Sequence, residues 1–113
     1  MNDEQIAKVA HEVNRAYCRA LGDTSQPVWE DAPERQRNSV VHGVAFVRAN
    51  PDAGPRHNHA EWLREKTEAG WTYEPVKDVE KKEHPCMQEF DSLSIEQQAK
   101  DFIFLGVVRA LIG

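Results

Sequence analysis

The sequence predicts an all-α fold, a compact bundle of about four helices with a long, ordered but irregular loop between the third and fourth helices. Apolar residues recur at steps of three and four in three stretches, the spacing that places them on one face of a helix, and a capping pair with helix formers before Gly70 indicates a further helical stretch. Between the last two stretches, from Trp71 to Phe90, no periodicity persists although large side chains continue. The chain has 113 residues, so we expect a single domain, residues 1–113, with a buried core.

The first helix is expected from Asp3 to Leu21. Gly22 follows it, and a glycine just past the last periodic residue takes the left-handed conformation that closes a helix. The apolar stripe of this helix is formed by Ile6, Val9, Val13, Tyr17 and Leu21.

The second helix is expected from about Pro33 to Ala49, because proline suits a first-turn position. Val40, Val44 and Val47 form one apolar row at helical spacing. This spacing favours a helix over a strand despite the β propensity of valine.

A cluster of proline and glycine at residues 50–55 separates an N-terminal helical pair, residues 1–50, from a second half, residues 56–113. The helices are expected to pair as one with two and three with four. Each pair should be antiparallel because its link is short. The two halves show no sequence repeat.

The third helix is expected to begin at Asn58, which forms a capping pair with Glu61, and to end before Gly70. Ser94 and Gln97 repeat the capping spacing ahead of the fourth helix. The apolar stripe of the fourth helix is formed by Phe102, Leu105, Val108 and Ile112.

Charge and composition exclude several classes of protein. The chain carries 14 Lys and Arg against 19 Asp and Glu, which disfavours a nucleic-acid polymer as partner. No apolar run approaches the roughly 20 residues that a membrane helix requires, so no membrane is expected as partner. No leader of the signal-peptide type is visible, and Cys18 and Cys86 are expected to be reduced thiols in the cytoplasm.

Uncommon residues follow one another in a specific order in the second half: His59-Ala-Glu-Trp62, Lys66, Gly70-Trp71-Thr-Tyr73, Pro75, Lys77-Asp78, Lys81, His84-Pro85-Cys86 and Leu93. This order resembles the RyR domain. That module occurs as tandem repeats in the cytosolic part of ryanodine-receptor calcium-release channels and as single copies in small prokaryotic and phage proteins. The resemblance implies a stand-alone, cytosolic helical module with the loop packed against it, and it lowers the expectation of catalysis.

Two of the candidate functional residues lie on the third helix, and the others lie in the loop. Its aromatic side chains either anchor the loop onto the helices or wall a pocket where a planar ligand stacks, with lysines supplying charge for a phosphate. Acidic residues are interspersed and can pair with the lysines instead. The candidate ligand-binding residues are Trp62, Lys66, Trp71, Tyr73, Lys77, Lys81, Lys82 and His84.

Three functions remain open from the sequence. The first is a non-catalytic recognition module that binds a small ligand, with a nucleotide-like molecule as candidate. The second is a protein interaction module, such as a homodimer, because the resembling modules of the channels occur in pairs. The third is an enzyme or metal site that uses His84 and Cys86. The spacing argues against the third, because Pro85 separates the two and no further ligand pair accompanies them, so no metal or cofactor is expected.

Overall fold

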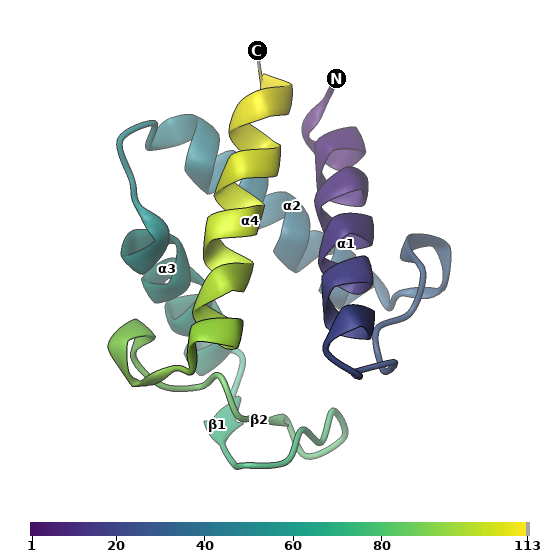
Figure 1. Ribbon diagram of the computed structural model, residues 1–113, viewed down its shortest axis with the longest axis vertical. Coiled ribbons are helices and arrows are strands. Elements are labelled where there is room, and N and C mark those ends of the chain that lie inside the picture. Colours follow the sequence, from purple (N-terminus) through teal and green to yellow (C-terminus); the bar gives the residue numbers. More distant parts are fainter. Residues whose placement is uncertain (113) are drawn as a thin grey trace. The chain divides into compact units, whose positions relative to one another are not determined.

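The computed structural model describes residues 1–112, which form four α-helices, two short 3-10 helices and two short strands (Figure 1). In chain order these elements are α1 (Asp3–Ala20), η1 (Trp29–Asp31), α2 (Glu34–Ala49), α3 (Pro55–Glu68), β1 (Thr72–Tyr73), β2 (Glu83–His84), η2 (Phe90–Ser92) and α4 (Ile95–Ile112). The predicted all-α class with four helices is confirmed. The long connection between α3 and α4 is more regular than predicted, since it contains a parallel pair of strands.

The chain divides into two compact units, each with its own packing. Unit 1 comprises Met1–Asp52 and the part of α4 from Ile103 onward, and unit 2 comprises Ala53–Phe102. The fourth helix therefore contributes to both units. This differs from the simple pairing of the third with the fourth helix that the sequence indicated.

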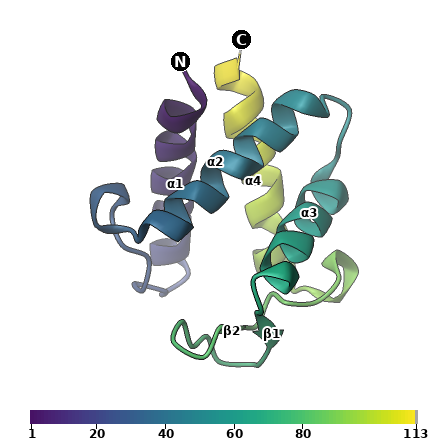
Figure 2. The same ribbon diagram turned by 180° about the vertical axis from the view of Figure 1, so that it is seen from behind.

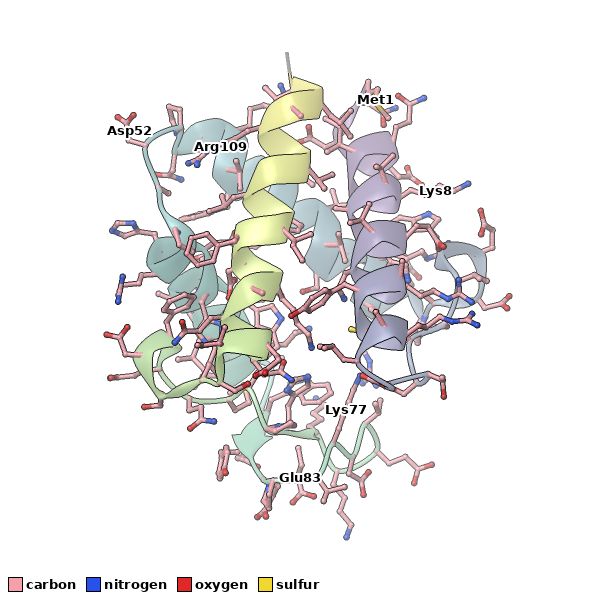
Figure 3. All side chains as sticks on the ribbon, in the orientation of Figure 1. Met1, Lys8, Asp52, Lys77, Glu83 and Arg109 are labelled. Atoms are coloured by element: carbon pink, nitrogen blue, oxygen red, sulfur yellow. The ribbon has the colours of Figure 1, made fainter. Side chains whose placement is uncertain are left out.

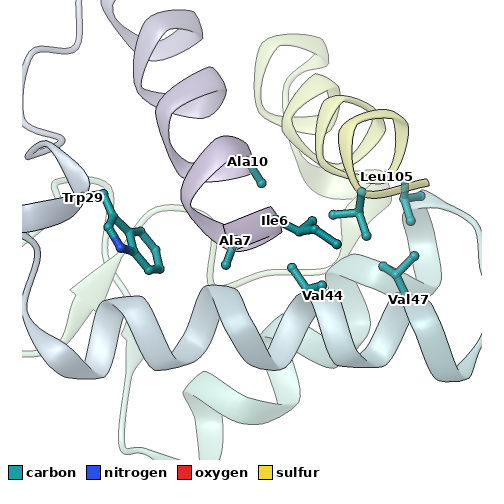
Figure 4. Packing of buried hydrophobic residues seen from close by; sticks show 8 residues of the cluster. Ile6, Ala7, Ala10, Trp29, Val44, Val47 and Leu105 are labelled. Carbon is teal, nitrogen blue, oxygen red and sulfur yellow. The ribbon is translucent and has the colours of Figure 1, made fainter. Parts of the chain in front are cut away.

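The core of unit 1 is formed by α1, η1, α2 and the second part of α4 (Figure 4). Its buried side chains are Ile6, Ala7, Ala10, Trp29, Val44, Val47, Leu105 and Val108. The helical assignment of the valine-rich stretch is confirmed. In unit 1, α2 runs in the opposite direction to α1, as expected, but crosses it obliquely instead of lying alongside it (Figure 2). Branched side chains from the crossing helices fill the space between them.

The starts of two helices differ from the prediction. Pro33 precedes α2 as its N-cap, with an extended ψ of 147°, and its carbonyl accepts the N–H of Arg37 at 3.1 Å. The third helix begins earlier than predicted, with Pro55 in its first turn. Asn58 does not cap it. Instead, the imidazole Nδ1 of His57 accepts the N–H of Gly54 at 3.1 Å.

Other predicted helix ends are confirmed. Gly22 and Gly70 follow α1 and α3 with left-handed φ angles of 90° and 93°. Ser94 caps α4, where its hydroxyl accepts the N–H of Gln97 at 3.3 Å.

The predicted apolar stripe of α4 is wrong at its first position. Phe102 is 60 % exposed, whereas its neighbour Asp101 is 8 % exposed. Adjacent helix residues point about 100° apart, so burial of the carboxylate turns the phenyl ring outward. The other three positions hold, since Leu105 and Val108 are buried and Ile112 packs against the same core.

Candidate ligand-binding site

Unit 2 has a small core of its own, and the predicted site residues surround it. Cys86, Phe90 and Leu93 are buried there, and Trp62 of α3 packs against them. This cluster draws the segment between β2 and α4 onto α3. It thereby positions the aromatic side chains that precede it in the chain.

Five rings of unit 2 follow one another in contact, and we call them the aromatic row: Phe90, His59, Trp62, His84 and Trp71. Phe90 meets His59 edge-on at 6.2 Å between ring centroids, and His59 stacks on Trp62 at 5.5 Å. His84 then stands edge-on to Trp62 at 5.3 Å and to Trp71 at 6.3 Å. Stacked and edge-on pairs at these separations are favourable, so the rings hold one another in place.

His59 anchors the middle of the row. It is 4 % exposed, and its Nε2 donates to the carbonyl of Gln88 at 2.7 Å. Its Nδ1 lies 3.6 Å from a carboxylate oxygen of Asp101, whose other oxygen accepts the amide of Asn58 at 2.9 Å. Asn58 thus serves this network rather than a helix cap.

The carboxyl of Asp101 is buried within this network. Burial raises its pKa above the ordinary value. The hydrogen bond from Asn58 and the charges of His59 and Lys100 oppose this shift without cancelling it.

The His84-Pro85-Cys86 segment has the geometry of a structural turn. The Nδ1 of His84 accepts the backbone N–H of Cys86 at 2.9 Å, so the proton of the neutral ring lies on Nε2. The thiol of Cys86 is buried and donates to Gln97 Oε1 at 3.1 Å. Among residues 1–112 no group of three or more His, Cys, Asp and Glu side chains is arranged to hold a metal ion.

The parallel strand pair brings His84 beside Trp71. In β1 and β2, Thr72 is in register with Glu83 and Tyr73 with His84. The N–H of Thr72 donates to the carbonyl of Lys82 at 2.9 Å. Lys82 adopts a left-handed φ of 55°, and its ammonium donates to the carbonyl of Ala69 at 2.7 Å at the end of α3.

The candidate lysines have different positions. The ammonium of Lys66 lies 5.7 Å from the ring centroid of Trp71, a cation–π contact at the end of the aromatic row. The ammonium of Lys82 is hydrogen-bonded to the carbonyl of Ala69 at the end of α3. Lys77 and Lys81 lie on the segment between the two strands; Figure 3 labels Lys77 on this segment and Glu83 at the start of β2.

Tyr73 is not a member of the aromatic row. It is 51 % exposed on β1, so it neither seals the loop against α3 nor takes part in the ring contacts described above. Trp62, Trp71 and His84 are each half-buried. These three rings are held by their neighbours while part of their surface remains accessible.

The residues predicted for this site did not include His59, Phe90 or Asp101. The three-residue spacing of His59 and Trp62 could have indicated their ring contact, because residues three positions apart lie on the same face of a helix. Phe90 and Asp101 carried no comparable local signal, because their partner His59 lies far away in the chain.

The comparison with family models matches the RyR domain over residues 51–110. This span includes α3, both strands, η2 and most of α4. It also contains every member of the aromatic row. Within residues 1–112, no helix combines the length and apolar character needed to cross a membrane.

Proposed function

This chain belongs to the RyR domain family, and we propose that it is a non-catalytic recognition module for a small planar ligand with anionic groups, a nucleotide being the candidate. The observation that carries the proposal is the half-buried end of the aromatic row near Trp71. There the half-buried rings of Trp62, His84 and Trp71 adjoin the ammonium of Lys66. We place the protein in the cytoplasm, in keeping with its two unbridged cysteines.

The chemistry of this end suits a base and a phosphate together. Stacking of a nucleic-acid base on an aromatic side chain contributes about 1–3 kcal/mol. A lysine ammonium is a compact point charge that attracts phosphate oxygens. Bound phosphate would compete with the indole of Trp71 for the Lys66 ammonium, so ligand binding and side-chain rearrangement are linked.

The roles of His84 and Cys86 support a module without catalysis. A nucleophilic cysteine needs an accessible thiolate with a base directed at it. Here the thiol is buried against Gln97, and Nδ1 of the imidazole accepts a backbone N–H. Both side chains stabilise the turn that carries the row.

A thermal-shift assay with a panel of ribonucleoside mono- and triphosphates at millimolar concentration tests the proposal. A ligand present at ten times its Kd stabilises the fold by about 1.4 kcal/mol, or roughly 5 °C for a domain of this size. Lys66→Ala should abolish the shift, whereas Lys8→Ala in unit 1 should retain it. If no nucleotide raises the melting temperature, the proposal is wrong.

Exposed apolar side chains favour a second candidate function, a protein interaction. Tyr73, Val76 and Val79 are 51 %, 75 % and 42 % exposed on the segment from β1 to β2. Such a cluster suits contact with a partner protein or a second copy. Light scattering at tens of micromolar distinguishes a second copy of the chain from another partner protein, because a strictly monomeric chain would exclude self-association.

A further inference from the structure

The C-terminal ends of α1 and α3 have the same hydrogen-bond pattern. Gly22 and Gly70 are 48 positions apart and have φ angles of 90° and 93°. The residues before them have equivalent cap conformations, with φ and ψ of −87° and 0° at Leu21 and −79° and −1° at Ala69. Three backbone hydrogen bonds correspond at this separation of 48 positions. At the end of α1, the N–H groups of Leu21, Gly22 and Asp23 donate to the carbonyls of Tyr17, Arg19 and Cys18, respectively. At the end of α3, those of Ala69, Gly70 and Trp71 donate to the carbonyls of Glu65, Thr67 and Lys66.

A buried histidine occupies the same place in both helices. His11 and His59 are also 48 positions apart, and each is 4 % exposed. The Nε2 of His11 donates to the carbonyl of Pro27 at 2.7 Å, as that of His59 does to Gln88 at 2.7 Å. Two residues after each carbonyl stands an aromatic ring that meets the imidazole edge-on, Trp29 at 5.7 Å and Phe90 at 6.2 Å.

An ion pair is repeated around each histidine. Lys8 and Arg56 each precede their histidine by three positions. They pair at 2.8 Å and 2.6 Å with Glu30 and Asp91, the residues that follow the two aromatic rings.

The elements beyond the rings correspond as well. Each ring begins a 3-10 helix of three residues, η1 or η2, and a long helix follows. The buried pair Val44 and Val47 of α2 has its counterpart in Leu105 and Val108 of α4, at the same distance from the ring.

One segment has no counterpart. Trp29 follows Gly22 by 7 positions, whereas Phe90 follows Gly70 by 20, so the second connection is 13 residues longer. Those additional residues hold β1, β2 and His84.

We infer that residues 3–49 and 55–112 are two copies of one structural unit, and that the side chains added in the second copy determine ligand recognition. The positions of Trp62, Lys66 and Trp71 hold Asn14, Cys18 and Asp23 in the first copy. The first copy forms the same helix end, histidine contact and ion pair without them. The aromatic row beyond His59 is therefore an addition to a complete framework, and each chain carries one recognition site.

The internal pair of copies also affects the expected assembly of the protein. The expectation of a homodimer assumed that the chain contains a single module. A chain that already contains two copies of the unit needs no second chain to form the pair, so we expect a monomer with one ligand bound.

The recognition part of this inference rests on the proposed function, and the experiment separates the two. His11→Leu and His59→Leu each leave one buried carbonyl without its donor, and each should lower the melting temperature by about 8 °C. Trp71→Asp installs the residue of the first copy, whose N–H makes the same bond at the helix end. It should keep the melting temperature within a few degrees of the native value.

Calorimetric titration with AMP measures the affinity and the stoichiometry of ligand binding. The native protein should bind one AMP per chain, Trp71→Asp should lose at least tenfold in affinity, and Trp71→Phe should recover most of it. Loss of stability in only one of the two histidine variants would refute the common framework. Unfolding of Trp71→Asp, or two AMP per chain, would refute the assignment of recognition to the second copy. If native protein fails to bind AMP while the histidine variants behave alike, the ligand proposal fails and the two-copy framework stands.

Discussion

Replacement of Asp101 by asparagine should make the free energy of unfolding of the protein change less with pH in the acidic range. The substituted side chain keeps an oxygen that accepts the amide of Asn58, at 2.9 Å in the native structure. Its new amide faces Nδ1 of His59, 3.6 Å from the native carboxylate oxygen. In the tautomer of that imidazole whose Nε2–H donates to Gln88, Nδ1 carries a lone pair that can accept the new amide. The variant should therefore fold with the network preserved.

The sign of the effect follows from the raised pKa of Asp101. The folded state holds the carboxyl proton more tightly than the unfolded state, whose pKa is near 3.8. Protonated Asp101 contributes stability that is fully present below that pH and is lost as the pH rises through the raised value. Within this window, native stability falls relative to Asp101→Asn by up to about 1.4 kcal/mol per pH unit.

Urea unfolding of both proteins at intervals from pH 3 to pH 8 measures this difference. Asp52→Asn removes one exposed carboxylate and controls for the change in net charge. We expect native protein to lose stability relative to Asp101→Asn as the pH rises, and the difference then to become constant. A difference that grows in favour of the native protein with rising pH would show that the buried carboxylate is stabilised, and would refute the reasoning.

Four further substitutions test local features of the chain. Gly22→Ala and Gly70→Ala should each cost about 1 kcal/mol of unfolding free energy, because an L-residue is strained at their left-handed φ angles; equilibrium denaturation measures both. Gly106→Ala should instead stabilise by about 0.5–1 kcal/mol, since Gly106 is inside α4 and an added Cβ meets nothing within 4 Å. A destabilised Gly106→Ala would contradict the open environment at that position. Ser94→Ala should cost about 1 kcal/mol through loss of the cap on α4, and an unchanged denaturation midpoint would show that the bond to Gln97 contributes nothing.

Features stabilised within a few residues were predictable from the sequence. Gly22, Gly70 and Ser94 act through backbone groups at most five positions away, so their roles follow from residue type and spacing. The third helix start was not predictable in this way. Asn58 had the spacing of a cap, but Pro55 already suited the first turn and a distant carboxylate engaged the Asn58 amide.

Features that depend on residues far apart in the chain were not predictable from the sequence. The burial of Asp101 in place of Phe102 depends on Asn58 and His59, which precede it by about 40 positions. The repeat of the structural unit was not predictable from the sequence either. Its copies share His and Gly at equivalent positions, but elsewhere they preserve only the chemical type, as in Lys8 and Arg56 or Glu30 and Asp91.

The candidate site was predictable in its main residues and not in its arrangement. Trp62, Lys66, Trp71 and His84 were identified as aromatic and basic side chains of one segment. Their assembly into a row depends on the parallel pairing of β1 with β2, which joins residues 11 positions apart without a local signal.

The three indole N–H resonances of the protein give the most direct test of the ligand site. Nitrogen-15 NMR resolves Trp29, Trp62 and Trp71 individually, and Trp29 is a built-in control because it is buried in the unit 1 core. On titration with AMP, we expect the Trp62 and Trp71 resonances to move with saturation while that of Trp29 stays in place. Movement of none of the three, or of Trp29 alone, would contradict a binding surface at the end of the aromatic row.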